Sequence, residues 1–148
     1  MTRLDDFKNI YNNVDALNKL MEHDKLFNYM NIRFTMVSRG HVELEFPISE
    51  NVVRVGNVLH GGMIMTAMDY TGGFTCMTVA SGMDQVTQEI KINFLAPMAK
   101  SPFKFIGDII KEGRTAIVVE IRAYDSEKKL CAIGLGTWYV LHDRTIGH

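Results

Sequence analysis

The sequence predicts an α+β domain in which an antiparallel sheet of about six strands wraps around one central buried helix, with another helix at the N-terminus. Between Val55 and Met83 the only formal charge is Asp69, and apolar residues lie on every side of a helical wheel. A helix of this kind is buried in a core. On both sides of it, short segments alternate apolar and polar residues, as half-buried strands do. No linker, repeat or low-complexity segment divides residues 1–148, which we interpret as a single domain.

The first part of the chain is predicted to be a helix followed by two strands. Residues 3–29 form the helix, because apolar residues recur there at steps of three and four: Leu4, Phe7, Ile10, Val14, Leu17 and Met21. The strands are expected over Ile32–Val37 and Val42–Ile48, on either side of a short turn. Residues 49–59 are interpreted as a loop. The core of the domain is expected to span residues 30–142.

Four further strands are predicted after the buried helix. They cover residues 86–96, 103–110, 115–124 and 130–141, with charged turns at 111–114 and 125–129. Both faces of the last strand are apolar. A sheet covered on both sides, in part by another subunit, explains this pattern.

The composition excludes several classes of function. Sixteen Lys and Arg against seventeen Asp and Glu leave no basic stripe for a nucleic-acid partner. Asp69 in the middle of the apolar stretch disfavours a membrane span. Cys76 and Cys131 cannot form a disulfide framework, and no histidine pairs with them at zinc-like spacing, so no metal is expected. The first residues lack the apolar run of a signal peptide, which favours a cytoplasmic protein.

Three features coincide where the buried helix begins. His60-Gly61-Gly62 stands at its start, an uncharged run follows, and Asp69 lies inside it. The unpaired N–H groups and partial positive charge of a helix N-terminus suit a developing oxyanion. Because glycine has no side chain, a substrate carbonyl can approach the Gly61 and Gly62 amides closely. A carboxylate in apolar surroundings is expected to be poorly hydrated, as a general base or nucleophile requires.

Each feature taken singly also has a purely structural explanation. The glycines can form a tight turn, His60 can be a satisfied core histidine, and Asp69 can bond a neighbouring amide or hydroxyl. Their coincidence favours a functional site, because a buried Asp is rare unless it is partnered or functional.

The spacing of Gly61 and Asp69 predicts at least a dimer. They are eight positions apart in the sequence, so on one helix they lie ~12 Å apart along the axis. A reacting carbonyl must lie within ~3 Å of both its oxyanion donor and its nucleophile. If both residues are catalytic, Asp69 must come from a second subunit across a two-fold interface.

These residues resemble the hotdog-fold acyl-CoA thioesterases, specifically the phenylacetic-acid-degradation (PaaI) type. The resemblance covers roughly residues 30–142. The matching segments are Asn57-Val-Leu-His-Gly-Gly-Met-Ile-Met-Thr-Ala-Met-Asp69, Thr87-Gln-Glu-Ile-Lys-Ile-Asn-Phe-Leu-Ala-Pro97, Gly113-Arg114-Thr115 and Ala132-Ile-Gly-Leu-Gly-Thr137. The most specific of these features is the acid nine positions after the histidine.

The resemblance implies hydrolysis of an acyl-CoA in a site between two subunits. By this resemblance Asp69 attacks the thioester or activates water, the Gly61 amide polarises the carbonyl, His60 shapes the turn and the sulfur side of the pocket, and Thr87 helps to position the acid or water. The residues expected to contact the substrate and its CoA portion are Asn57, Gly62, Phe94 and Arg114. No cofactor is implied, since coenzyme A is part of the substrate. Members are commonly homodimers that pair into homotetramers.

The sequence departs from the family pattern at two positions. Relatives often carry Asn or Gln six positions before the histidine, where this chain has Arg54, so the group that holds the water is unassigned. Thr87 lies on the opposite phase of its strand from Val86 and Ile90. Only a bulge or the subunit interface would turn it toward the acid.

Two other functions remain open at this stage. The first is a non-catalytic acyl-CoA binding or sensing module on the same fold. The second is hydratase or dehydratase chemistry, which needs a His–acid pair at a different spacing and ranks last. The sequence does not determine the acyl-chain class.

Overall fold

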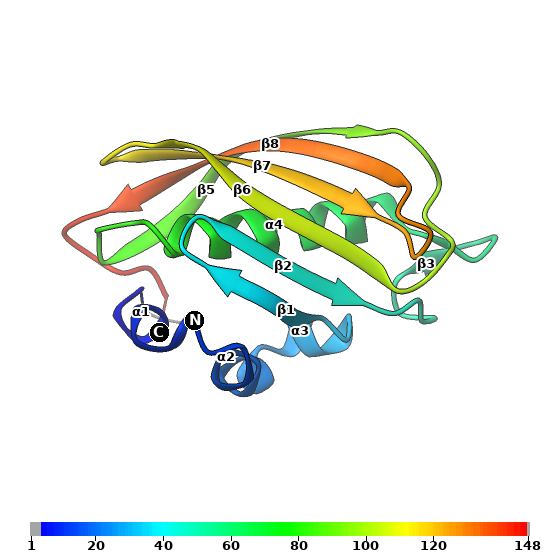
Figure 1. Cartoon of the computed structure of the whole chain (residues 1–148), viewed down its shortest axis with the longest axis horizontal. Coiled ribbons are helices and arrows are strands. Elements are labelled where there is room, and N and C mark those ends of the chain that lie inside the picture. The colour runs from blue at the N-terminus through cyan, green and yellow to red at the C-terminus, as the bar shows by residue number, and fades with distance from the viewer. Residues whose placement is uncertain (1–3, 148) are drawn as a thin grey trace.

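A six-stranded antiparallel sheet curls around one long helix in the computed structural model, which describes residues 4–147 (Figure 1). The strand order is β1-β2-β6-β7-β8-β5. The strands are β1 Arg33–Ser38, β2 His41–Phe46, β5 Asp84–Phe94, β6 Phe103–Glu112, β7 Ala116–Tyr124 and β8 Leu130–Leu141. The predicted α+β class, with its central helix and N-terminal helical segment, is confirmed.

The central helix, α4, runs from Gly61 to Met77 and is buried most deeply in its second half. Tight packing against the sheet explains the glycines in this half: a Cβ atom at Gly72 would lie 2.0 Å from the indole of Trp138 on β8. The first half is less covered, and the side chains of Met65 and Asp69 are exposed. The helix is therefore apolar all round, as predicted, but in the single chain it is not buried all round.

The prediction of one helix over residues 3–29 is wrong for the described part, residues 4–29. The segment forms α1 Leu4–Ile10, α2 Val14–Leu20, the short 3₁₀ helix η1 Met21–His23 and α3 Lys25–Tyr29. Polar residues interrupt the helical run by capping new helices. The Asn13 side chain accepts a hydrogen bond from the Ala16 amide, and the Asp24 side chain accepts one from the Phe27 amide.

These short helices cover one edge of the sheet and one end of α4 (Figure 1). Asn18 of α2 pairs with backbone groups at the free edge of β1. Its side chain accepts a hydrogen bond from the Phe34 amide and donates one to the Phe34 carbonyl. The ring of Phe7 in α1 packs on Phe74 of α4, with the ring centroids 5.5 Å apart. The N-terminal segment thus closes the side of the domain that the sheet leaves open.

Two local features depart from the predicted strands and loop. The segment 49–59 contains a small hairpin, β3 Val53–Arg54 and β4 Val58–Leu59, whose turn uses positive φ at Gly56 and Asn57. The predicted strands are confirmed with shifted ends, and both β5 and β6 carry a register shift, between Thr87 and Glu89 and between Ile109 and Lys111.

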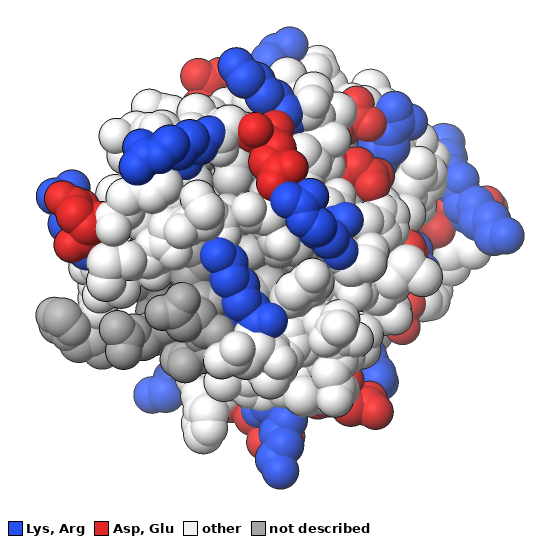
Figure 2. Space-filling view, turned by 60° about the vertical axis from the view of Figure 1, so that its left-hand side comes forward, with Lys and Arg blue, Asp and Glu red and all other residues white. Residues whose placement is uncertain are grey.

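The two faces of the sheet differ in what covers them. The inner face of β8, which includes Trp138, packs on α4, whereas Leu135 and Tyr139 on the outer face are substantially exposed in the single chain. Acidic and basic side chains are interspersed on the face of the molecule seen in Figure 2.

Within residues 4–147, no helix is long and apolar enough to span a membrane.

Candidate active site

The start of α4 carries one backbone donor that has no acceptor among residues 4–147. His60 is the N-cap, and its Nδ1 accepts a hydrogen bond of 2.8 Å from the Gly62 amide. Its carbonyl accepts from the amides of Met63 and Ile64. Among the first four amides of the helix, only that of Gly61 has no partner in residues 4–147. Because His60 Nδ1 acts as the acceptor, the neutral ring carries its proton on Nε2.

The Gly61 amide opens onto a hollow that we call the glycine-side hollow. Its volume is about 310 Å³, and its lining includes Arg54, Gly61, Ile64, Phe94 and Pro97. A Cβ atom at Gly61 would lie 3.8 Å from the Phe94 ring, so the absence of a side chain leaves this approach open. A free N–H at a helix N-terminus suits a carbonyl oxygen that gains negative charge.

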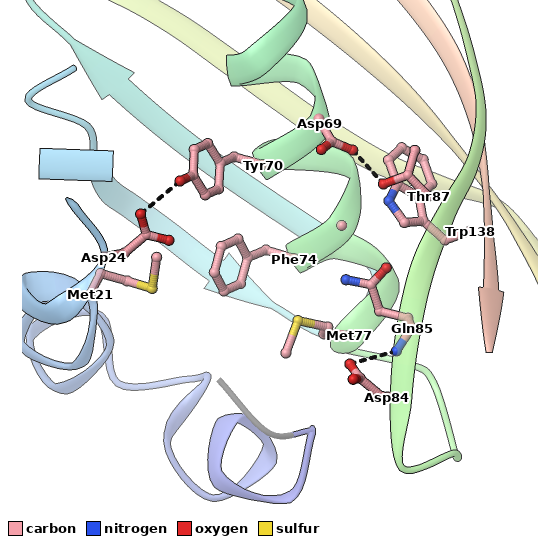
Figure 3. A pocket seen from close by; sticks show the side chains of 11 residues that line it. Met21, Asp24, Asp69, Tyr70, Phe74, Met77, Asp84, Gln85, Thr87 and Trp138 are labelled. Carbon is pink, nitrogen blue, oxygen red and sulfur yellow. Dashed lines mark hydrogen bonds between the residues drawn. The ribbon is translucent and has the colours of Figure 1, made fainter. Parts of the chain in front are cut away.

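Asp69 lies two helical turns further along α4 and is held by Thr87 of β5. The Thr87 hydroxyl donates a hydrogen bond of 2.6 Å to Asp69 Oδ1 (Figure 3). The expectation that Asp69 is buried is wrong for the single chain, where the residue is exposed. The reason is that Asp69 lies beside Thr87 on β5, an edge strand of the sheet, which pairs only with β8 among the described strands.

A bulge in β5 turns Thr87 toward α4. The sequence requires such a bulge, or the subunit interface, if Thr87 is to contact the acid. Thr87 lies opposite Trp138 of β8, and after the extra residue Gln88 the ladder resumes so that Ile90 lies opposite Gly136. Residues opposite each other in a sheet share a face. Thr87 and Ile90 therefore both face α4, although simple alternation along the strand would separate them.

The predicted site residues other than Asn57 form two groups within one chain. His60, Gly61, Gly62 and Phe94 lie near the start of α4. Asp69 and Thr87 lie at the other end of β5. The turn that contains Arg114 lies at this end too, because Tyr139 of β8 pairs with Val86 on one side and with Ala116 on the other. Thr87 and Phe94 are roughly 20 Å apart along β5. A shallow groove lined by Gly62, Met65 and Asp69 connects the two groups along the exposed side of α4.

Asn57 lies apart from both groups. It occupies the turn of the β3–β4 hairpin with a φ of 56°, and it does not line the glycine-side hollow, the shallow groove or the cavity beside Asp69. The positive φ that this turn requires explains why an asparagine stands at this position of the motif. A role of Asn57 in substrate binding remains a prediction. Among residues 4–147, no three His, Cys, Asp or Glu side chains are placed to hold a metal ion.

A cavity of about 250 Å³ opens beside Asp69 and runs along α4 toward the N-terminal helices (Figure 3). We call it the acid-side cavity; it is lined by Met21, Asp24, Asp69, Tyr70, Gly73, Phe74, Met77, Asp84, Gln85, Thr87 and Trp138. Its far end is closed where the Tyr70 hydroxyl donates to Asp24 Oδ1 at 2.8 Å. Burial, reinforced by this hydrogen bond, raises the pKa of Tyr70 above its ordinary value of about 10, so the phenol stays a donor.

Sequence reasoning missed most of this cavity. Asp24 and Tyr70 are 46 positions apart, and Gln85 and Trp138 looked like ordinary strand residues. The only available signal was the N-cap pattern of Asp24, which breaks the predicted N-terminal helix. Arg54, which stands where relatives often carry Asn or Gln, lines the same hollow as Gly61.

Comparisons with known proteins bear on the family of this chain. The family model described as "Thioesterase superfamily" matches residues 56–132. A proposed esterase of Saccharolobus solfataricus, SSO2140, is 46% identical over 121 residues, which cover 82% of this chain and 86% of that protein.

Two solved structures share the fold. The PaaI protein from the phenylacetic acid degradation operon of E. coli has a TM-score of 0.77 at 17% identity, covering 88% of this chain and 96% of that one. The protein smu.793 of Streptococcus mutans, solved with bound acetyl-CoA, has a TM-score of 0.70 at 25% identity, covering 78% and 92%. The hotdog fold of the PaaI type, expected from the sequence motifs, is confirmed.

Proposed function

Because the chain belongs to the thioesterase superfamily, we propose that it hydrolyses acyl-CoA thioesters to the free acid and coenzyme A. The observation that carries the proposal is the Gly61 amide at the start of α4, which has no partner within the described chain, on the same helix as the Thr87-bound carboxylate of Asp69. The first is a donor for an oxyanion, and the second is a nucleophile or a general base.

In this proposal the site combines Gly61 of one subunit with Asp69 of another. The ~12 Å between them along α4 keeps one chain from supplying both groups to one carbonyl. The shallow groove between them contains Met65, and the glycine-side hollow contains Phe94 and Leu95. These three apolar side chains are between 52% and 55% exposed. The free edge of β5 also lies here. Pairing of two copies along this edge buries these groups and creates two equivalent sites.

A second pairing of the dimers follows from the other face of the sheet. Leu135 and Tyr139 leave an apolar outer surface on β8 that the described chain does not cover. Contact through this surface, or through another, would assemble two dimers into the tetramer that is common in the family.

The substrate class is supported by the chemistry of the glycine-side hollow. The structure of the Streptococcus mutans relative contains acetyl-CoA. In this chain Arg54 lines the hollow that also contains Gly61, with its guanidinium donating a hydrogen bond to the Val55 carbonyl, and the Phe94 ring supplies an apolar wall. We assign this hollow to the thioester arm of CoA, with Arg114 of the second subunit available to a phosphate or the adenine. Coenzyme A enters as part of the substrate, so no separate cofactor is required.

The chemistry follows from these positions. Either the Asp69 carboxylate attacks the thioester carbon directly, or it takes a proton from a water that attacks. In both routes the carbonyl oxygen becomes an oxyanion that accepts the Gly61 N–H, and the C–S bond then breaks to release CoA as the thiolate, which takes up a proton. In the direct route, water subsequently hydrolyses the acyl–Asp69 anhydride.

A thiol-release assay tests the proposal. We would measure turnover of acyl-CoAs from acetyl to palmitoyl, together with phenylacetyl-CoA and benzoyl-CoA, by the parent protein and by Asp69→Asn. We expect at least one acyl class to be hydrolysed and the variant to lose about 100- to 10,000-fold in kcat. Acyl-CoA binding measured by calorimetry without any turnover would instead indicate a sensing module.

A further inference from the structure

We propose that the acid-side cavity limits the acyl group of the substrate to an uncharged chain or ring of about ten carbons or fewer, and that Tyr70 and Met21 set this limit. This inference rests on the proposed function and names its substrate class. It follows from the place of the cavity beside Asp69, from the rigid wall that closes it, and from its volume and charge.

The cavity begins where the acyl group must lie. Asp69 and Thr87 are part of its lining and are hydrogen-bonded to each other. Gly73 and Met77, one and two helical turns after Asp69 on α4, also line it, so the cavity extends about 12 Å along the helix axis. A thioester whose carbonyl is within reach of the Asp69 carboxylate, with its CoA portion in the glycine-side hollow of the other subunit, therefore directs its acyl group into this cavity.

The side of the cavity opposite the sheet is closed by the N-terminal segment. Met21 and Asp24 are the lining residues that come from this segment, and Met21 is only 3% exposed. Figure 3 shows both of them across the cavity from Gln85 and Trp138. All other lining residues belong to α4, β5 or β8. The N-terminal segment thus decides how far an acyl group extends away from the sheet.

Tyr70 is fixed in this wall through both its ring and its hydroxyl. The centroid of its ring lies 5.4 Å from that of Phe27 in α3 and 6.4 Å from that of Phe74 in α4. The hydroxyl donates to Asp24 Oδ1 at 2.8 Å, and the same oxygen accepts the Phe27 amide at 2.9 Å. An acyl group that displaces Tyr70 has to break these contacts between α3 and α4, so the wall gives the cavity a fixed size.

The volume of the cavity sets the limit in carbons. An apolar cavity of about 150 Å³ takes up one benzene ring, which has six carbons. On that scale the 250 Å³ of the acid-side cavity accommodates about ten carbons. Octanoyl and phenylacetyl groups, with eight carbons each, are below this limit, whereas a dodecanoyl chain is above it.

The charge of the lining excludes acyl groups that end in a carboxylate. The lining has three acids and no Lys, Arg or His: Asp24, Asp69 and Asp84. Asp84 is 4% exposed, and its two carboxylate oxygens accept the amides of Gln85 and Ile146, each at 2.8 Å. A further carboxylate bound here has no counter-charge, and burial of an unpaired charge is strongly unfavourable.

The first test measures kcat/KM for a series of acyl-CoAs, below the concentration at which they form micelles. We expect kcat/KM to fall at least about 10-fold from octanoyl-CoA to dodecanoyl-CoA, because a chain that does not fit keeps its carbonyl away from Asp69. Butanoyl-CoA and succinyl-CoA have acyl groups of equal carbon number, and we expect a similar ratio in favour of butanoyl-CoA. Equal values within both pairs would overturn the inference and leave the thioesterase function intact.

Two variants that enlarge the cavity locate the limit. Tyr70→Ala removes the ring, and Met21→Ala shortens the neighbouring side chain. We expect each variant that folds, as judged by circular dichroism, to raise the ratio of dodecanoyl-CoA to octanoyl-CoA turnover, measured as kcat/KM, about 10-fold over the parent. Tyr29→Ala makes the same change in α3 at a 51% exposed side chain that does not line the cavity, and this control should keep the parent's ratio. An unchanged ratio in both cavity variants would contradict the assignment.

A binding measurement separates this inference from the proposed function. Dissociation constants for the same acyl-CoAs are measured with Asp69→Asn, so that no turnover is needed. Tighter binding of octanoyl-CoA than of dodecanoyl-CoA supports the cavity assignment even if the parent protein hydrolyses nothing, in which case the thioesterase proposal fails alone. Binding that strengthens steadily from butanoyl-CoA to dodecanoyl-CoA rejects the cavity assignment whatever the parent's turnover.

Discussion

The hydroxyl of Thr87 donates a 2.6 Å hydrogen bond to the carboxylate of Asp69, although simple alternation along β5 would direct it away from the helix. The extra residue Gln88 makes the contact possible, because it shifts the register between Thr87 and Glu89. One inserted residue thus places a hydroxyl beside the only acid on α4. The bond fixes the orientation of the carboxylate and leaves its other oxygen free for a substrate or water.

Removing the Thr87 hydroxyl is expected to slow turnover without unfolding the protein. Thr87→Val keeps the shape of the side chain, so the carboxylate loses its donor and its fixed orientation, and we expect kcat to fall about 10-fold. Thr87→Ser keeps the hydroxyl and serves as the control, with kcat close to that of the parent. Steady-state kinetics of both variants checks this, and equal kcat values for Val and Ser would refute the positioning role.

The Gly61 amide can be deleted with little disturbance of the helix. Gly61→Pro removes the N–H at the first helical position, where proline is well tolerated, and His60 already has the extended backbone that precedes proline, with φ −65° and ψ 135°. We expect kcat to fall about 100- to 1000-fold with an unchanged melting temperature. Gly61→Ala keeps the N–H and should lose much less. Comparable losses in both variants would indicate steric blockage instead of a missing donor.

The His60 side chain is expected to matter first for stability. His60→Ala leaves the Gly62 amide without its acceptor, and loss of an N-cap costs about 1 kcal/mol in free energy of unfolding. His60→Asn supplies another capping acceptor and should restore most of this loss. Chemical denaturation of the three proteins measures the difference. If Asn stabilises no more than Ala, His60 does not act as the cap in solution.

A histidine away from the site predicts how stability depends on pH. His41 of β2 lies between Asp108 and Glu43, with ring-nitrogen to oxygen distances of 2.6 and 2.8 Å. Burial alone would lower the pKa of His41, but the hydrogen bonds to these carboxylates outweigh it, and the pKa is raised above its ordinary value of about 6.5. The charged imidazole therefore stabilises the fold fully below about pH 6.5, and this contribution disappears as the pH rises through the raised pKa.

The comparison with His41→Gln isolates this contribution. We expect the parent to exceed the variant in melting temperature by a larger margin near pH 6 than near pH 8. Thermal unfolding of both proteins across this range provides the measurement. A margin that stays constant or grows toward pH 8 would contradict the predicted sign.

The parts of the fold that the sequence predicts well are those controlled by local pattern. The uncharged run around Asp69 identifies α4, and the alternation after Gly82 identifies the strands, because burial of one face imposes a fixed period. The His60-Gly61-Gly62 motif likewise predicts a helix start with a free amide. Here the chemistry of a few adjacent residues determines the structure.

The parts that could not be predicted depend on contacts between distant residues. No local sequence pattern marks the bulge at Gln88. The two hydrogen bonds between the Asn18 side chain and the backbone of β1 help to hold α2 in place, where the sequence predicts a continuous helix. The exposure of Asp69 depends on the edge position of β5, which alternation does not reveal. The acid-side cavity needs Tyr70 to meet Asp24, 46 positions away.

The shared site is the central claim, and mixed assemblies test it most directly. Asp69→Asn and Gly61→Pro subunits, each inactive alone, are co-expressed with different tags, and assemblies holding both are purified through the two tags. A site between subunits pairs the intact Gly61 of one with the intact Asp69 of the other, so we expect roughly a quarter to a half of the parent's thioesterase activity to return. Mixed assemblies no more active than either variant alone would show that the two residues do not act together across the interface.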